Sequence, residues 1–278
     1  MSSIHSNYNA MFAARQMGMH EKEMSQSLER LSSGYRINSA ADDPAGLGIS
    51  ERMRAEITGL QQAQNNALAG MDMLDTAEGS LIEVHTMLNR LVDIADRAAT
   101  GTTTEEQRGH LQREADEIIA ELRRTASATN FNGIPLLDGN EDYSELTLQI
   151  GTSGNAYDQL RLKMPNLAAI IEDLDLDNFD VTTQESAQNM IDPVNAAIER
   201  VSEARATIGA QVNRLESVVR NLGVYEENLT DAESRIRDVD VARETMRFAR
   251  ADLLHQAAQA MMAHAIQQQA RILELLRM

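Results

Sequence analysis

The fold of this chain is decided by residues 190–239, which read MIDPVNAAIERVSEARATIGAQVNRLESVVRNLGVYEENLTDAESRIRDV. Apolar or small side chains recur there at steps of three and four: Met190, Val194, Ala197, Val201, Ala204, Ile208, Leu215, Val218, Leu222, Tyr225, Leu229, Ala232, Ile236 and Val239. Gln211 is the one polar member of the series. A repeat of 3.5 residues is typical of a coiled-coil helix, here roughly 75 Å long. Such a helix needs another long helix beside it.

Residues 44–99 can supply that partner. Asp43 suits an N-cap and Pro44 a first helical residue. One apolar seam contains Met53, Ile57, Leu60, Ala67, Met71 and Leu74, with Gln64 in phase, and a second contains Ala77, Leu81, Val84, Leu88, Leu91, Ala95 and Ala98. The change of phase predicts a slip near Gly79. At roughly 84 Å this helix matches the first, which predicts an antiparallel pair.

The middle of the chain predicts one shorter helix and a strand pair. Thr104 and Gln107 fit a capping box for a helix over residues 104–127. Within residues 138–180, apolar residues alternate with polar ones in two runs: Leu146, Leu148, Ile150 and Leu160, Leu162, Met164. The last long helix, about residues 183–239, begins either at a capping box of Thr182 and Glu185 or at Asp192-Pro193. The expected fold is mainly α, a long antiparallel helical bundle or coiled coil with a small β-hairpin in the middle.

Both ends of the chain are apolar helices with too little of their own chain to cover them. No Asp, Glu, Lys or Arg occurs between Leu253 and Ala270. A helix that is apolar nearly all round is a buried helix. We therefore expect the ends to bury against other copies, or in a groove of a partner protein. The candidate assembly residues are Met17, Met24, Leu28, Leu31, Leu253, Leu254, Ala257, Met261, Ile266, Leu273 and Leu276.

Composition excludes several classes of function. The net charge of −18 argues against nucleic-acid and anionic-membrane binding, and the absence of Cys excludes disulfides and thiolate sites. The sequence contains no run of about 18 apolar residues, so we expect no transmembrane helix. The first residues lack the pattern of a cleaved secretory signal. We expect a protein that stays in the cytoplasm or leaves by a route without such a signal.

Catalytic and metal-binding patterns are incomplete, so we expect neither an enzyme nor a cofactor. His20 begins a zinc-protease-like motif, but Met24 stands where its second His belongs. Asp173, Asp175 and Asp177 alternate like calcium ligands. However, Asn178 and Gln184 replace the Gly and the closing Glu of a calcium loop.

Several segments resemble bacterial flagellins closely. Residues 31–40, LSSGYRINSA, with residues 42–46, DDPAG, resemble the N-terminal signature of that family. Residues 130–133, NFNG, resemble its internal turn. Residues 228–240, NLTDAESRIRDVD, together with residues 256–261 and 275–277, resemble its C-terminal region. The resemblance covers about residues 1–150 and 180–278.

The resemblance implies a structural subunit that self-assembles into the flagellar filament for motility. It implies an inner coiled-coil domain from residues 1–40 and 240–278 and a rod domain over residues 41–239, without outer domains. Implied partners are other flagellin subunits, an export chaperone at the C-terminal helix, and the filament cap and hook-associated proteins. Export implies a secreted, extracellular filament, with a periplasmic one as the alternative. A hook–filament junction protein and a soluble coiled-coil adapter are the competing interpretations.

Two positions depart from the family pattern. Residues 263–269 lack a proline that the family often has there, which predicts a more continuous last helix. Arg90 and Glu114 resemble the patch that a flagellin-sensing Toll-like receptor reads. The surrounding Val92, Ile94 and Asp96 differ from the usual residues.

Overall fold

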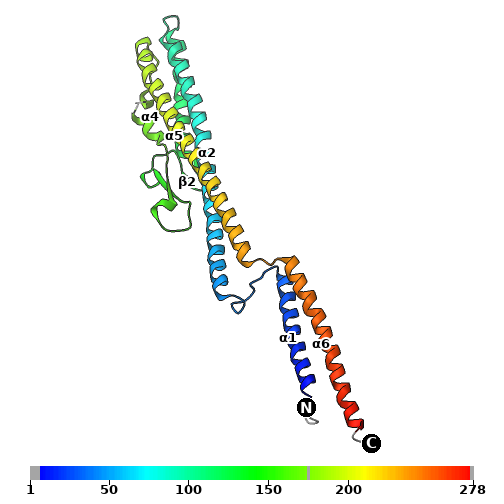
Figure 1. Cartoon of the computed structure of the whole chain (residues 1–278). Helices are drawn as coiled ribbons and strands as arrows, with labels where there is room; N and C mark the ends of the chain where they lie inside the picture. Colours follow the sequence, from blue (N-terminus) through cyan, green and yellow to red (C-terminus); the bar gives the residue numbers. More distant parts are fainter. Residues whose placement is uncertain (1–6, 174–175, 276–278) are drawn as a thin grey trace. The chain divides into compact units, whose positions relative to one another are not determined.

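Long helices make up most of the chain. The computed structural model describes residues 7–173 and 176–275, without the side chains of residues 141, 177, 269 and 272–275. The helices are α1 (Tyr8–Ser33), α2 (Pro44–Ala99), α3 (Glu105–Ala128), α4 (Leu167–Asp173), α5 (Gln184–Arg237) and α6 (Val241–Leu275). Two short strand pairs, β1 (Asn130–Phe131) with β2 (Ile134–Pro135) and β3 (Glu145–Gln149) with β4 (Gln159–Lys163), and three 3-10 turns complete it. The predicted fold class is confirmed (Figure 1).

The chain divides into two compact units. The first contains residues up to Ala55 and from Asn228 onward, and the second contains residues 56–227. The first unit is therefore built from two segments far apart in the sequence, and the second from one continuous segment. The domain boundaries expected at residues 40 and 240 stay a prediction.

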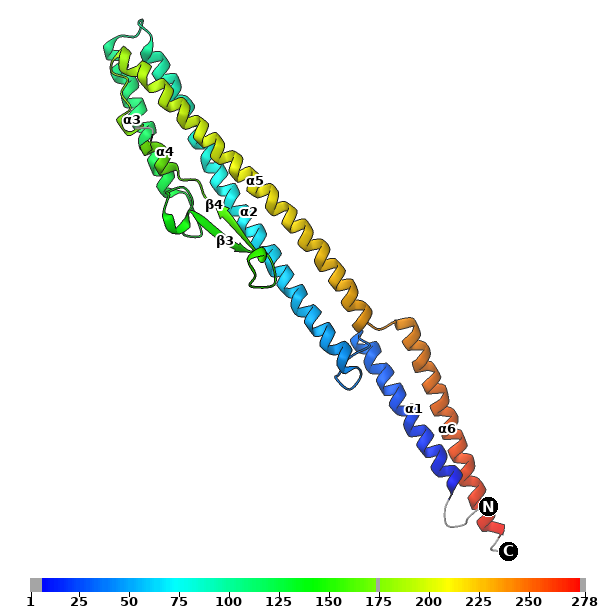
Figure 2. The ribbon, with the colours of Figure 1, turned by 60° about the vertical axis from the view of Figure 1, so that its left-hand side comes forward.

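In the second unit, α2 and α5 lie side by side and run in opposite directions (Figure 2). Their facing stripes form one core with the inner face of α3 and with the hairpin. Arg108, which is nearly buried, caps the end of α2: its Nε donates to the Ala98 carbonyl (2.8 Å) and its Nη2 to that of Thr100 (3.1 Å). The capping box of Thr104 and Gln107 is present, as predicted.

The predicted phase slip in α2 is wrong. Its buried stripe keeps steps of three and four throughout: Leu60, Ala63, Ala67, Gly70, Leu74, Ala77, Leu81, Val84, Leu88, Leu91, Ala95 and Ala98. Ala63 and Gly70 hold the positions that the prediction gave to Gln64 and Met71, which are half-buried. A Cβ at Gly70 would lie 2.2 Å from Leu148 Cδ1 of β3. A side chain at this position would have to displace Leu148, because the hairpin packs directly on the seam there.

The start of α5 also differs from both predicted starts. Thr183 caps it, since its Oγ1 accepts from the Ser186 amide (3.1 Å). Thr182 instead donates its amide and its hydroxyl to Asp180 (2.9 and 2.7 Å). Pro193 lies inside the helix.

The predicted strand pair is present as the antiparallel β3–β4 hairpin, with Leu146 opposite Leu162 and Leu148 opposite Leu160. Gly59 of α2 makes a second close contact with it, because a Cβ there would lie 2.8 Å from Thr152 Cγ2. The shorter β1–β2 pair turns at Asn132 and Gly133, both with positive φ (50° and 82°). The hairpin thus covers the α2 seam where the helix carries glycine.

Candidate assembly surface

The first unit contains an antiparallel pair of helices, α1 and α6 (Figure 1). Asn7 starts α1, accepting from the Ala10 amide (3.0 Å) and donating its Nδ2 to the Ala265 carbonyl (2.9 Å). Asp240 caps α6 by accepting from the Arg243 amide (3.1 Å). The contact between Asn7 and Ala265 places the start of α1 beside the later part of α6.

The two helices meet along a seam of small and flexible side chains. On α1 one stripe of less exposed positions contains Ala10, Ala13, Met17, His20, Met24, Ser27 and Leu31. The stripe of α6 contains Glu244, Phe248, Ala251, His255, Ala258, Met262 and Ala265. Both sets follow the heptad spacing of a coiled coil. Only Ala13, Ser27, Glu244 and Ala251 of this seam are buried, so the pair alone makes a thin core.

The outer faces of the same helices carry exposed apolar side chains. On α6 these include Leu253 (66% exposed), Met261 (63%) and Ile266 (53%). On α1 they include Met11, Phe12, Met19 and Leu28. A groove of about 460 Å³ between the helices is lined by Phe12, Ala13, Gln16, Ala258, Met261 and Ala265, among others. Phe12 and Met261 thus lie at one groove, and exposed apolar side chains that gather in this way mark an interaction site.

The predicted assembly residues fall into two groups. Met17, Met24 and Leu31 are half-buried in the α1–α6 seam. The others that can be placed, Leu28, Leu253, Leu254, Ala257, Met261 and Ile266, are exposed on the outer faces. The Leu273 side chain and residue Leu276 lie outside the described part of the chain. The prediction therefore mixes residues that hold the pair together with residues that the pair leaves uncovered.

Several residues of this surface were missing from the prediction. Phe248 and Ala251 lie in the seam, and Met11, Phe12 and Met19 lie on the outer face of α1. Phe248 and Ala251 follow Glu244 at the heptad spacing of α6, so that spacing is the signal that could have identified them. The signal is weak because the first residue of the repeat, Glu244, is charged.

The linkers that lead into the helix pair are hydrogen-bonded to each other. The Arg36 amide donates to the Arg237 carbonyl (2.6 Å), and the Val239 amide donates to the Gly34 carbonyl (3.0 Å). The Arg237 guanidinium lies 4.7 Å from the Tyr35 ring centroid and donates to Glu51 Oε1 (2.9 Å). This short antiparallel ladder sets where α1 ends and α6 begins.

Arg90 and Glu114, 24 residues apart in the sequence, form one surface ion pair. Arg90 Nε on α2 donates to Glu114 Oε1 on α3 at 2.7 Å. Both side chains are about two-fifths exposed, so the pair is open to a partner.

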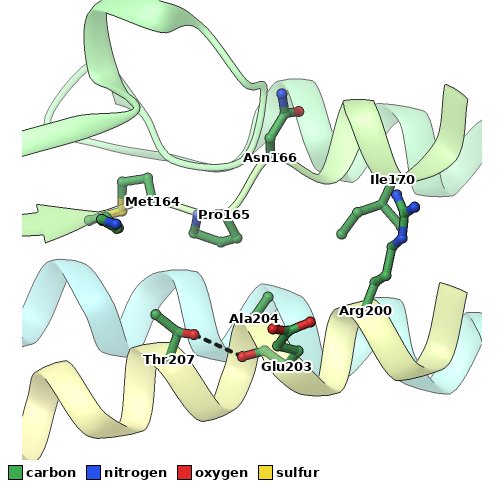
Figure 3. A pocket seen from close by; sticks show the side chains of 9 residues that line it. Met164, Pro165, Asn166, Ile170, Arg200, Glu203, Ala204 and Thr207 are labelled. Carbon is green, nitrogen blue, oxygen red and sulfur yellow. Dashed lines mark hydrogen bonds between the residues drawn. The ribbon is translucent and has the colours of Figure 1, made fainter. Parts of the chain in front are cut away.

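An open cleft of about 370 Å³ lies where Met164, Pro165 and Ile170 face Arg200, Ala204 and Thr207 of α5 (Figure 3). Its dashed bond, from Thr207 Oγ1 to the Glu203 carbonyl, is internal to α5. Arg200 is paired with Asp173 (2.9 Å).

Metal ligands do not gather anywhere in the described residues, which hold no group of three or more His, Cys, Asp or Glu side chains placed for a metal. Of the alternating aspartates, Asp175 and the Asp177 side chain lie outside that part. No helix among the described residues is both long and apolar enough to cross a membrane.

Comparisons with known proteins agree with the architecture. Residues 4–142 match the family model described as the bacterial flagellin N-terminal helical region, and residues 191–276 match the bacterial flagellin C-terminal helical region. A flagellin of Halalkalibacterium halodurans is 43% identical over 274 residues, which cover 99% of each chain. The crystal structure of Bacillus cereus flagellin superposes with a TM-score of 0.51, at 26% identity, over 57% of this chain and 88% of that one.

A Vibrio parahaemolyticus structure assigned as a flagellar hook-associated protein also superposes, with a TM-score of 0.59. It covers 71% of this chain and all of its own, at 16% identity, and so shares the fold.

Proposed function

Because the chain belongs to the bacterial flagellin family and is a structural subunit of the flagellar filament, we propose that subunits join through the outer faces of α1 and α6. Flagellins are structural proteins, so the prediction that the chain is not an enzyme is confirmed. The filament is a polymer of flagellin subunits, and its subunits are exported. The proposal names the surface that carries the polymer contacts.

The exposed leucines and methionines of α6 carry this proposal. A two-helix pair covers one stripe of each helix, and the α6 stripe that faces α1 already begins at Glu244. Leu253, Leu254, Ala257 and Met261 form a second stripe, offset from the first. A helix with two apolar stripes packs against two neighbours. Burying a leucine or methionine side chain contributes about 1.5–3 kcal/mol, so a second copy gains from covering this stripe.

Electron microscopy of the purified full chain under polymerising conditions tests the proposal. The double variant Leu253→Glu/Met261→Glu places charges on the outer stripe and should form no filaments. The matched control, Leu253→Met/Met261→Leu, keeps both positions apolar and should polymerise. A chain lacking about residues 1–40 and 240–278 should remain monomeric. Filaments from the glutamate variant equal to those of the parent would rule the outer stripe out.

The same terminal helices are the basis of our proposals for the domains and for the partner proteins. We propose that residues 1–40 and 240–278 act as the inner domain of the filament and residues 41–239 as its rod. The apolar C-terminal helix is the surface that an export chaperone would cover before assembly. The filament cap and hook-associated proteins would meet the same helices at the filament ends. Co-purification of an export chaperone with the parent, but not with the glutamate variant, would support the shared surface.

We propose Arg90 and Glu114 as a surface for the flagellin-sensing Toll-like receptor. The two side chains come from different helices, and their ion pair holds them as one exposed patch. Purified monomer should activate a receptor reporter cell line, and Arg90→Ala/Glu114→Ala should activate it less. A parent that gives no signal beside an active control flagellin would remove the receptor from the partners.

We propose that the filament is extracellular, with a periplasmic filament as the alternative. The chain has no cysteine, so one introduced thiol reports its own accessibility. Tyr157, 79% exposed in the loop between β3 and β4, is a suitable site. A membrane-impermeant maleimide should label Tyr157→Cys on intact cells. Labelling only after the outer membrane is permeabilised would instead place the filament in the periplasm.

A further inference from the structure

A buried hydrogen bond joins α1 to α6 within the otherwise small-residue seam. Ser27 Oγ donates to Glu244 Oε1 at 2.7 Å, and the two residues are 5% and 4% exposed. Arg30 Nη1 lies 3.9 Å from the same oxygen, and Arg247 Nη1 lies 3.4 Å from Oε2. A buried carboxylate is costly unless it is paired and hydrogen-bonded in this way. The Glu244 carboxylate is therefore stable only where α1 offers it hydrogen-bonding and charged partners.

The apolar residues of the seam have no such preference. Alanines and methionines repeat along both helices at heptad spacing, so moving α6 along α1 by seven residues still places seam against seam. In the observed register Ala258 lies near Ala13, and both line the groove between the helices. After a shift of one heptad, Ala251 would take the place of Ala258 opposite Ala13. Packing alone leaves these registers close in free energy, since methionine adapts to either.

Within the seam, the position of Glu244 separates the registers, as the Asn7–Ala265 hydrogen bond and the linker ladder do at the two ends of the helix pair. A shift towards the start of α1 places Glu244 opposite His20, whose Nδ1 already lies 3.2 Å from Glu23 Oε2. A shift the other way places it opposite Gly34, the C-cap of α1, which has no side chain to donate. Only the observed register offers the carboxylate a buried hydroxyl. Single buried polar residues fix register in coiled coils in this manner.

We propose that the Ser27–Glu244 hydrogen bond fixes the register of the α1–α6 coiled coil, and with it the alignment of the outer apolar faces shown to a second copy. The inference rests on the proposed function, because alignment matters only if those faces carry the polymer contacts. Each subunit must present the same face at the same height for a regular polymer to grow. The buried pair supplies specificity that the small seam residues lack.

Disulfide trapping in the polymerised full chain tests the register, because the chain has no cysteine of its own. Ala13→Cys/Ala258→Cys reports the observed register, and Ala13→Cys/Ala251→Cys reports a shift of one heptad. Oxidised filaments are dissolved without reductant, and the intrachain product is separated from covalent dimers by gel mobility. In the parent, the first pair should form the intrachain bond and the second should not.

Adding Ser27→Ala should raise the ratio of shifted to native intrachain product at least about fivefold, the change expected when a buried acceptor loses its donor. Ser27→Thr, which keeps a hydroxyl, should restore the parent ratio. Ser25→Ala, at an exposed position of the same helix, is the matched control and should leave the ratio unchanged.

The outcomes separate this inference from the proposed function. Filaments of Ser27→Ala with the parent ratio would overturn the register role and leave the assembly surface intact. If Ser27→Ala forms no filaments, the Ser27→Thr variant is the deciding test. Ser27→Thr filaments with the native intrachain disulfide support the proposal, and a failure of Ser27→Thr to form filaments overturns it. If the Leu253→Glu/Met261→Glu variant forms filaments as the parent does, the proposed assembly surface is overturned instead.

Discussion

Gln211 of α5 exchanges two hydrogen bonds with the backbone of Lys163 in β4. The Lys163 amide donates to Gln211 Oε1 (3.1 Å), and Gln211 Nε2 donates to the Lys163 carbonyl (3.0 Å). The side-chain amide thus acts like one residue of an adjacent strand along the edge of β4. Gln112 of α3 binds the chain in the same way, donating to the Phe179 carbonyl and accepting from the Val181 amide, both at 2.7 Å.

We predict that Gln211→Ala destabilises the rod by about 2 kcal/mol. Each lost hydrogen bond accounts for roughly 0.5–1.5 kcal/mol, and the Lys163 amide and carbonyl lose their partner. For a domain of this size the loss corresponds to a fall in melting temperature of about 4–8 °C. Circular dichroism during heating measures it. Gln188→Ala, at an exposed position of the same helix, is the control and should shift the transition by less than about 2 °C.

We predict that replacement by alanine destabilises the protein at Gly139 but not at Gly154. Gly139 has φ of +75°, and a Cβ there would lie 2.1 Å from Asn166 Oδ1. That oxygen accepts from the Ala169 amide at the start of α4 (2.8 Å). Gly139→Ala must therefore strain the turn and displace a cap, at a cost of about 2–3 kcal/mol. Gly154→Ala meets open space and should be nearly neutral. Equal urea midpoints for the two variants would contradict this account.

Asp180 makes part of the rod stability depend on pH. Hydrogen bonds from the Thr182 amide, and next from its hydroxyl, lower the pKa of Asp180 below its ordinary value of 3.8. A lowered folded-state pKa adds stability that is present above the unfolded pKa and is lost as the pH falls through the folded one. Asp180→Asn should therefore be less stable than the parent at pH 7, and the gap should close below about pH 4.

Urea unfolding at pH 7 and pH 3 measures that gap. Thr182→Ser keeps both donors and should follow the parent at each pH. A gap between Asp180→Asn and the parent that stays constant down to pH 3 would show that the loss at pH 7 comes from shape rather than charge.

The long helices were predictable because their pattern repeats many times. In α5 the steps of three and four persist from Met190 to Val218, so one misplaced residue cannot hide the period. The predicted α2 seam is right from Ala77 onward, and before it Leu60, Ala67 and Leu74 are also right, whereas Gln64 and Met71 are wrong. The buried stripe uses Ala63 and Gly70, whose small or absent side chains give a weaker signal for a helical face than their larger neighbours Gln64 and Met71. Small seam residues reflect what packs on them, here Leu148, which lies 78 positions further along the chain.

The polar residues that join α1 to α6 were harder to predict, because their partners lie far away in the sequence. Ser27 and Glu244 are polar, and each alone looks like a solvent-facing residue of an amphipathic helix. Their meaning comes from a contact across 217 residues of sequence. Gln211 is the one polar member of its seam, but its partner is the backbone of Lys163, which no side-chain pattern reveals. Periodicity finds helices, whereas contacts between a side chain and a distant backbone need the folded chain.

The last prediction concerns two glycines of α1 whose replacement by alanine should act in opposite directions on filament stability. Gly34 is the C-cap of α1, with φ of +76° and open space around its Cβ position, so Gly34→Ala introduces backbone strain alone, about 1 kcal/mol. Gly18 lies inside α1, also with open space, so Gly18→Ala should stabilise the helix by about 0.5–1 kcal/mol. Scanning calorimetry of assembled filaments should show a lower transition temperature for Gly34→Ala and an equal or higher one for Gly18→Ala. A fall for Gly18→Ala would mean that a neighbouring copy approaches the backbone at Gly18, and the contact surface would then extend from the outer stripe of α6 to that face of α1.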